Sequence, residues 1–431
     1  MDKTIHMKPI FNSLGSNYDF NFVKLALKQI SFGGGISVDV NRNNDASIDS
    51  LQQYLDKAYQ GKSFLFYKGR DAIEFSLRIL LGEGNVGEDN DSSVKYKVLT
   101  QAFSCFAVEE GIKRAGMIPV YVDVCEDSTN MSVQTLIQAL ESNKDAKAVL
   151  VQHSLGIPAD IIEIRKWCNK HNLLLIEDLA QAIGGFDKAD QPLGTNSDVV
   201  IFSFSRDKII DAVSGGAVVF KNLSNEQREK IEIILTNDLE KITKKIIFKD
   251  MIYPFITYFG RKTHDVLIGK IILKLSRIFG LITSPAISRT SKLSMMSPAY
   301  AELVLRSFIK LEKQLIHRRK IASFYLDKIS NQNIKVVNTK NDVETGSNLR
   351  FSIRTTKVDK LINLMKDHKI YLSDRWYRSA VDCGKQACHT EYKSGLAVNA
   401  EKLANEIFNL PTHRNISLKK ASRIIDVLNK F

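Results

Sequence analysis

The fold is decided by three stretches: LLLIEDLAQAIGGF at residues 173–186, VVIFSFSRDKI at 199–209 and SGGAVVF at 214–220. Each contains a continuous run of large apolar residues instead of an alternating pattern, which is typical of strands buried on both faces of a sheet. Asp178 directly follows the strand-like stretch LLLIE, and Lys208 follows the second stretch, VVIFSF. An acid and a lysine after two buried strands predict a functional site at one edge of the sheet.

Outward from these stretches, helix-like and strand-like segments alternate between about residues 70 and 222. Helical periodicity occurs at residues 71–81, 105–115, 132–142 and 160–171. Strand-like runs occur at residues 96–100, 118–124, 148–152, 173–177, 199–204 and 217–220. Such alternation implies right-handed crossovers and a mainly parallel sheet covered by helices, so the pattern predicts a three-layer α/β domain.

The second part of the chain predicts a smaller domain. Residues 297–328 form a long helical pattern, and residues 334–431 mix short strands with helices, as expected of an α+β lobe. We therefore expect a large domain with the N-terminal segment at residues 1–238. A basic amphipathic insert is expected at 239–295, and a linking helix with the small C-terminal domain at 296–431.

Charge and hydropathy exclude several classes of protein. The 431 residues carry a net charge of +13, and residues 239–293 alone hold eleven Lys or Arg against three acids, a net of +8. No recognisable nucleic-acid module accompanies this excess, so no nucleic-acid partner is predicted. No run of about 18 uncharged apolar residues predicts a spanning helix. The N-terminus also lacks the pattern of a secretory signal, so a cytoplasmic location is expected.

The five cysteines are odd in number and mostly far apart, which favours free thiols in a reducing compartment. Cys383, Cys388 and His389 lie close together, but no second ligand pair exists elsewhere in the chain. We therefore predict no metal site.

The basic insert allows two interpretations. Its basic residues recur at helical spacing: Lys241, Lys245 and Lys249, then Lys270, Lys274 and Arg277. The favoured interpretation is helices packed in a dimer with their lysines in water. The alternative is a peripheral membrane contact through residues 241–282. That alternative depends on the interleaved aromatic residues Tyr253, Phe255, Tyr258, Phe259 and Phe279.

Residue chemistry favours an aldehyde cofactor. A lysine can form an imine with an aldehyde, and its amine can then move a proton. In pyridoxal 5'-phosphate (PLP) the ring withdraws electrons well while its nitrogen is protonated, and a buried carboxylate such as Asp178 would hold that proton. Gly69, Arg70 and Asp71 precede a helical run and would supply backbone N–H groups for the phosphate, with Ser203 supplying a hydroxyl.

The three opening stretches closely resemble the DegT/StrS family of PLP-dependent sugar aminotransferases, which have the aspartate-aminotransferase fold. Upstream, AFSCFAVEEGIKRAGMIPVYVDV and QHSLGIPADI resemble the family's corresponding segments. Downstream, LEKQLIHRRKIASFYLDKI and AEKLANEIFNLPTHRNIS resemble its later helices and its "LP-x-H" signature. The resemblance covers about residues 60–230 and 295–431.

This resemblance implies roles for individual residues. Lys208 would form the Schiff base and move the proton, Asp178 would partner the ring nitrogen, and Gln181 would bind the ring hydroxyl. The implied phosphate positions are Gly69, Arg70 and Ser203. The position that covers the ring falls on Cys105, with Phe103 and Phe106 on either side as alternatives, and His153 lies at a strand end near the site.

Two positions depart from the family pattern. Relatives usually have Gly-Thr or Gly-Ser where this chain has Gly69-Arg70. Many relatives also extend an Asn across the dimer interface to the phosphate, and Leu293 stands at that position here. Lys292, Ser291 or Arg289 are the alternatives for that contact.

The implied activity is transfer of an amino group from an amino acid, with glutamate favoured, to a nucleotide-linked keto-sugar. Such reactions belong to surface-polysaccharide or amino-sugar biosynthesis, and the family's enzymes are homodimers. Two other functions stay open: a non-catalytic regulatory or membrane-surface protein of this fold, and a PLP enzyme of different chemistry, such as a dehydratase. The sugar, the ring carbon and the kind of acceptor linkage are left open.

Overall fold

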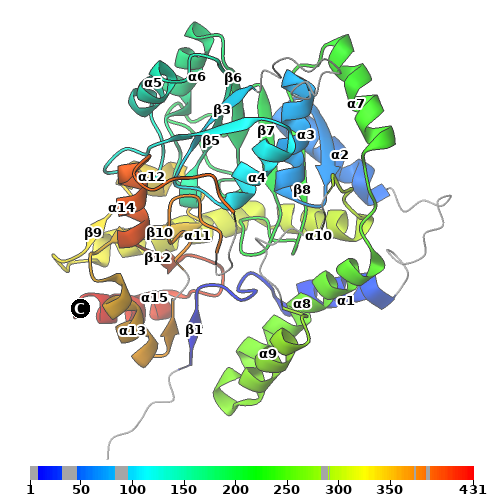
Figure 1. Ribbon diagram of the computed structural model, residues 1–431. Coiled ribbons are helices and arrows are strands. Elements are labelled where there is room, and N and C mark those ends of the chain that lie inside the picture. Colours follow the sequence, from blue (N-terminus) through cyan, green and yellow to red (C-terminus); the bar gives the residue numbers. More distant parts are fainter. Residues whose placement is uncertain are drawn as a thin grey trace, which may run out of the picture.

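The computed structural model describes residues 8–31, 46–82, 96–282, 290, 292–372, 375–384 and 389–431. Its centre is a seven-stranded sheet, and the first five of its strands alternate with helices, as predicted (Figure 1). The strands are β2 (Lys62–Phe66), β3 (Lys97–Gln101), β4 (Ile118–Val122), β5 (Ala146–Gln152), β6 (Leu174–Asp178), β7 (Val199–Ser203) and β8 (Gly216–Phe220). The helices between them are α3 (Gly69–Leu81), α4 (Phe106–Arg114), α5 (Val133–Glu141) and α6 (Ile161–Lys170).

The strand order is β2-β8-β7-β6-β5-β3-β4. Strands β3 to β7 pair in parallel, and β8 runs antiparallel to both of its neighbours, which confirms the mainly parallel sheet. Because β6 and β7 are parallel neighbours, with Asp178 paired to Ile201, their carboxyl ends lie side by side. The residues that follow these two strands are therefore brought together.

Two apolar cores lie on opposite faces of the sheet. Along β5, Val149 and Val151 join one core, while Ala148 and Leu150 join the other. The first core contains residues of α5, α6, α2 (Ala46–Tyr59) and α10 (Pro298–Phe308). The second core contains residues of α3, α4 and α7 (Asn225–Asn237). The predicted three-layer arrangement is thus confirmed.

The smaller lobe has its own core and a three-stranded antiparallel sheet of order β12-β10-β9. Its elements are α11 (Leu311–Lys328), β9 (Lys335–Val336), α12 (Lys340–Thr345), β10 (Arg350–Arg354), α13 (Val358–Asp367), β11 (Ile370–Tyr371), α14 (Val398–Glu406), β12 (Ile407–Pro411) and α15 (Leu418–Leu428). The long helical pattern at 297–328 is divided into α10 and α11. Strand β1 (Ile10–Phe11) pairs with β11, so it lies against the smaller lobe.

The basic insert forms a helical hairpin of α8 (Lys244–Lys262) and α9 (Ile268–Ile278) beside α1 (Phe20–Ser31) (Figure 1). The inner side of α8 places Ile247 and Met251 in a core of the large domain. Tyr253 is buried, so it cannot serve the membrane contact predicted from the aromatic residues, because its ring packs inside the protein. None of the described helices combines the length and hydropathy needed to span a bilayer.

The cysteines differ in part from expectation. Cys105, Cys125 and Cys168 are free thiols, as predicted, but Cys383 is disulfide-bonded and its partner lies outside the described residues. The prediction of a free thiol was wrong for Cys383, because the closeness of Cys383 to Cys388 was considered only as a sign of metal binding and not of a disulfide.

Candidate active site

A cavity of about 370 Å³ lies at the carboxyl ends of β6 and β7. Seven of the ten residues to which the resemblance assigns roles line it: Gly69, Arg70, Cys105, Asp178, Gln181, Ser203 and Lys208. The acid and the lysine that were singled out from sequence therefore face one space, in line with the rule that sites form beyond the carboxyl ends of parallel strands.

Asp178 ends β6 and is 6% exposed. Its Oδ1 accepts a hydrogen bond from the Ala180 N–H (2.8 Å), which fixes the direction of the carboxyl group. Burial raises the pKa of Asp178, and the Ala180 N–H, Lys208 and His153 oppose that rise. A cation placed beside this carboxylate would therefore be strongly stabilised.

Lys208 lies on a loop after β7 that is tightly braced. Asp207, just before it, has a left-handed φ of 64°, and its N–H donates to the carboxylate of Asp211 (2.8 Å). Asp211 also accepts from the Tyr18 hydroxyl (2.6 Å), and the Asn17 amide donates to the Lys208 carbonyl (3.1 Å). The N-terminal segment thus holds the lysine loop in place.

Burial lowers the pKa of the Lys208 amine, and Asp178 is the largest influence that opposes this shift. The Lys208 Nζ lies 5.1 Å from the centre of the Trp376 ring. A buried amine with a lowered pKa is more often neutral, which is the form that attacks a carbonyl or takes up a proton.

The start of α3 is pressed closely against β7 and β8. A Cβ added to Gly69 would lie 3.0 Å from the Ser203 Cβ, and one added to Gly216 would lie 2.3 Å from the Lys68 carbonyl oxygen. Only glycine allows the backbone to come this near. The first N–H groups of α3 and the Ser203 hydroxyl therefore share one end of the cavity, while Arg70 there forms an ion pair with Glu110.

Of the three candidates for covering a ring, only Cys105 lines the cavity. Phe103 is buried behind it, with its ring 4.9 Å from that of Tyr377 in an edge-on arrangement. Trp376 is an aromatic residue that does line the cavity, with its ring beside the Lys208 amine, and sequence reasoning missed it.

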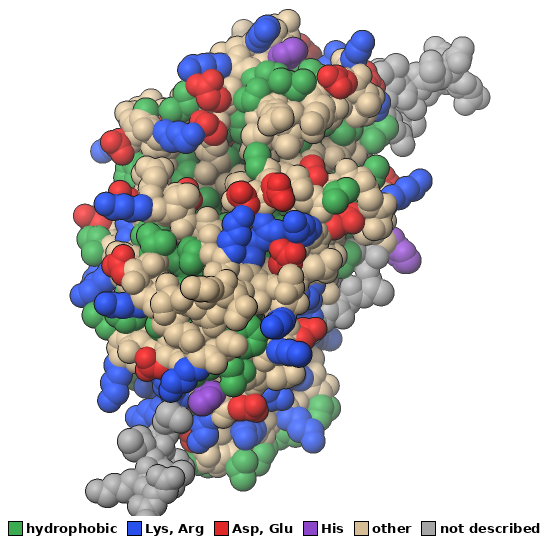
Figure 2. Space-filling model, turned by 90° about the vertical axis from the view of Figure 1, so that its left-hand side faces the viewer, with side chains coloured by type: hydrophobic (Ala, Val, Ile, Leu, Met, Phe, Trp, Pro, Cys, Tyr) green, Lys and Arg blue, Asp and Glu red, His purple; other side chains and the backbone are tan. Residues whose placement is uncertain are grey.

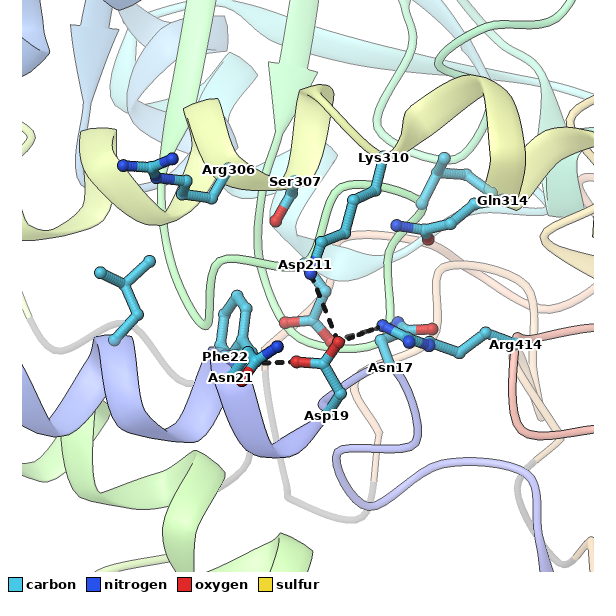
Figure 3. Close-up of a pocket in the computed structure, with 12 residues that line it drawn as sticks. Asn17, Asp19, Asn21, Phe22, Asp211, Arg306, Ser307, Lys310, Gln314 and Arg414 are labelled. Atoms are coloured by element: carbon cyan, nitrogen blue, oxygen red, sulfur yellow. Dashed lines mark hydrogen bonds and ion pairs between the residues drawn. The ribbon is translucent and has the colours of Figure 1, made fainter.

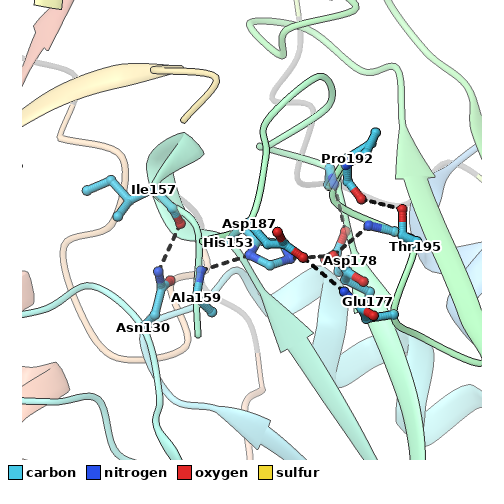
Figure 4. Close-up of polar contacts among 12 residues, drawn as sticks. Asn130, His153, Ile157, Ala159, Glu177, Asp178, Asp187, Pro192 and Thr195 are labelled. Atoms are coloured by element: carbon cyan, nitrogen blue, oxygen red, sulfur yellow. Dashed lines mark hydrogen bonds and ion pairs between the residues drawn. The ribbon is translucent and has the colours of Figure 1, made fainter. Parts of the chain in front are cut away.

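His153 does not line the cavity. Its Nδ1 accepts from the Ala159 N–H (2.9 Å), so Nε2 carries the proton and donates to Glu177 (3.0 Å), as Figure 4 shows. Because these two contacts join the loop after β5 to Glu177 of β6, we interpret His153 as a buried residue that supports β6 beside the site.

Gln181 is already engaged by the protein. Its side-chain oxygen accepts from the Leu155 N–H (2.7 Å), and its amide nitrogen donates to the Tyr377 hydroxyl. Tyr377 lines the cavity together with Arg375 and Arg378, from a segment that sequence reasoning did not connect with the site. The signal in that segment was its cluster of Arg and aromatic residues, WYR at 376–378.

A buried network joins the insert to the site. Arg206, two residues before Lys208, forms an ion pair with Asp250 of α8 (3.0 Å), and its guanidinium lies 3.8 Å from the centre of the Tyr253 ring. The hydroxyls of Tyr67 and Tyr300 donate to the other oxygen of Asp250 (both 2.9 Å). Helix α8 therefore braces the lysine loop and the residues that lead into α3.

The residues proposed for a cross-subunit contact are only partly described. Leu293 is buried in the core beneath α3, which rules it out as a polar ligand. Lys292 forms an ion pair with Glu240 (3.2 Å), and Ser291 and Arg289 lie outside the described residues.

A second cavity of about 260 Å³ borders the lysine loop (Figure 3). Asp211 lines it, and Asp19 in its wall pairs with Lys310 (3.3 Å) and Arg414 (2.8 Å). Because Lys208 does not line this second cavity, we place the reactive site in the first.

Several proteins of known activity are similar to this chain. GDP-perosamine synthase from Vibrio cholerae is 36% identical over 28% of this chain, and the match covers 33% of that enzyme. dTDP-3-amino-3,4,6-trideoxy-alpha-D-glucose transaminase from Micromonospora megalomicea is 24% identical over 84% of this chain and 83% of its own length.

Solved structures share the fold. DesV from S. venezuelae has a TM-score of 0.68 at 19% identity and covers 95% of this chain and 94% of its own. NtdA from Bacillus subtilis has a TM-score of 0.67 at 18% identity, covering 99% and 86%. A family model also matches residues 68–429. With the site and the fold in agreement, the chain belongs to the DegT/DnrJ/EryC1/StrS aminotransferase family.

Proposed function

We propose that the chain is a PLP-dependent aminotransferase that moves an amino group from an amino acid, with glutamate as the expected donor, to a nucleotide-linked keto-sugar. The observation that carries this proposal is that the Lys208 amine and the Asp178 carboxylate line one cavity at the ends of adjacent strands. The setting would be surface-polysaccharide or amino-sugar biosynthesis, by a cytoplasmic homodimer.

The cavity fits PLP. The N–H groups at the start of α3 and the Ser203 hydroxyl suit its phosphate, and Asp178 suits its ring nitrogen. The buried Asp178 has a raised pKa, so a protonated ring nitrogen would supply the cation that this carboxylate favours. NtdA, which shares the fold, was solved with the related cofactor PMP.

When bound, PLP supplies an electron sink that makes the proton on the amino-bearing carbon acidic. The chain's own residues must then move that proton and exclude water. Lys208 is suited to take up the proton at Nζ and return it. Burial lowers the pKa of its amine and so keeps more of it in the neutral form that accepts a proton. Asp178 keeps its direction through Ala180, and the Trp376 ring lies beside the amine.

The lining favours an anionic acceptor. Five of the lining side chains other than Lys208 are cationic, against three acids. The cations are Lys68, Arg70, Arg206, Arg375 and Arg378, and the acids are Asp178, Asp207 and Asp382. Positive charge in a low-dielectric cleft attracts phosphate groups, although Arg70 and Arg206 are already paired with Glu110 and Asp250 outside the lining. The names of the GDP- and dTDP-sugar enzymes similar to this chain support the same substrate class.

The test begins with absorbance. The purified protein mixed with PLP should show a band at roughly 410–430 nm from the lysine-bound cofactor. Lys208→Ala should remove that band, whereas Lys188→Ala, a change in an exposed lysine paired with Asp160, should leave it. Glutamate should then bleach the band in the unaltered protein, and nucleotide-linked keto-sugars should restore it.

Two outcomes would redirect the proposal. Failure to form the band would favour a non-catalytic role. The "Pleiotropic regulatory protein" of Geobacillus stearothermophilus, whose name suggests such a role, is 25% identical over 84% of this chain. A band that no amino donor bleaches would favour different PLP chemistry, such as dehydration.

A further inference from the structure

Helix α9 exposes a continuous apolar surface. Five side chains, which we call the α9 face, are 47% to 70% exposed: Ile268, Ile271, Leu275, Ile278 and Phe279. Their spacing of mostly three or four residues places them on one side of the helix. Val266 and Leu267, in the turn before α9, extend this surface. Single exposed apolar residues are common, but a contiguous group of this kind indicates a contact surface.

The rest of α9 divides into two further sides. Gly269, Leu273 and Ser276 are buried where α9 crosses α8. Lys270, Lys274 and Arg277 are exposed and form a basic row next to the α9 face. An exposed apolar row flanked by Lys and Arg is the pattern of a helix that lies in the plane of a membrane interface.

A cationic cavity adjoins the turn that leads into α9. It has a volume of about 220 Å³ and is lined by Lys8, Arg261, Lys262 and Lys420, with Asp265 as the only carboxylate in its described lining. Burial lowers the pKa of Lys420, and the neighbouring cations lower it further. An anionic group that enters the cavity from outside would reduce the repulsion between these positive charges.

We propose that the α9 face, with the cationic cavity beside it, docks the protein on an anionic bilayer surface. The apolar side chains would enter the headgroup region, and the basic row and the cavity would contact lipid phosphates. Figure 2 shows basic side chains more frequent than acidic ones over the lower half of one face of the molecule. Segment 239–293 carries a net charge of +8 in sequence.

A second copy of the chain fits this surface less well. A two-fold interface pairs the same patch on both subunits, so the basic row of one α9 would approach that of the other. Like charges brought together cost free energy, whereas an anionic bilayer neutralises both basic features at once.

Flotation of the PLP-loaded protein with vesicles tests the proposal. Binding is expected to phosphatidylcholine vesicles that contain phosphatidylglycerol, and not to phosphatidylcholine alone. Lys270→Gln with Lys274→Gln should weaken partitioning about fivefold for each charge removed. Ile271→Asn with Ile278→Asn should weaken it about tenfold for each apolar side chain.

The matched control is Ile309→Asn with Ile316→Asn, which changes two isoleucines of similar exposure near α10 and on α11. These variants should bind vesicles normally, and every variant should keep the cofactor absorbance band and its unfolding temperature. Three results would overturn the proposal: no binding to anionic vesicles, equal binding to both kinds of vesicle, or an α9-face variant that converts a dimer to a monomer in light scattering.

Discussion

Asp250 of α8 is the centre of the buried network beside the site, which the sequence did not predict. It is 1% exposed, on a helix whose sequence looks basic and amphipathic, and it binds Arg206 and two tyrosine hydroxyls at once. A buried ion pair of this kind adds little net stability, but removing one partner is costly because the other charge stays buried. Its effect is to fix the loop that carries Lys208.

Asp250→Asn should therefore lower the free energy of unfolding by about 3–5 kcal/mol, measured by urea denaturation. Tyr300→Phe is the matched control, since it removes one hydrogen bond to Asp250 and keeps the ion pair, and should cost about 1 kcal/mol. If both variants lose the same small amount, the ion pair does not brace the loop.

Sequence alone predicted Lys208, Asp178 and Ser203 because each follows a continuous apolar strand, and strand ends of one sheet meet. It could not predict Asp250 or Trp376, because their contacts with the site come from folding distant segments together. It also could not show that Phe103 faces the core while Cys105 faces the cavity, since the turn before α4 decides that orientation.

The α8–α9 hairpin depends on two glycines at its crossing. A Cβ on Gly269 would lie 2.1 Å from the Gly260 carbonyl oxygen, so the helices approach as closely as their backbones allow. The basic periodicity of the insert predicted two helices correctly, but it could not show that α8 is buried in the large domain. Sequence patterns report which side of a helix is apolar and not what covers that side.

Gly269→Val should force α9 away from α8 and destabilise the hairpin by roughly 2 kcal/mol or more, because the contact is with backbone that cannot move aside. Hydrogen exchange over residues 268–278 should quicken. Ile271→Ala, on the exposed side of the same helix, should stay within about 0.5 kcal/mol of the unaltered protein. Unchanged exchange in Gly269→Val would mean that the hairpin tolerates a wider spacing.

Charged residues are buried at several places in the molecule, and those on α3 are the clearest case. Burial raises the pKa of Asp71 to about 6 and of Glu74 to about 7, while Arg114 pairs with both (3.1 and 2.7 Å) and opposes the shift. In the folded protein these carboxyls hold protons to higher pH than in the unfolded chain. Their contribution to stability is therefore complete at low pH and is lost as pH rises through about 6 to 7.

Glu74→Gln should remove part of this dependence. As pH rises from 5 to 8, the unaltered protein should lose on the order of 2 kcal/mol more unfolding free energy than the variant. Urea denaturation at a series of pH values measures it. A difference that stays constant across this range would show that Glu74 ionises normally in the folded state.

The fold class was predictable, but the placement of residues 10–17 was not. β1 pairs with β11, Arg350 donates to the Asn12 carbonyl (3.1 Å), and Asn17 bonds to Arg318 (3.3 Å) as well as to the lysine loop. Short strands paired across hundreds of residues leave no periodic signal.

This arrangement bears on how the protein is made. The ribosome releases the segment around Asn17 first and its partners in the smaller lobe last, so the amino end must wait for nearly the whole polypeptide before it can be tied down. Trp376 and Tyr377 of the cavity lining are also made late, so a nascent or truncated product that ends before them would lack part of the wall around Lys208.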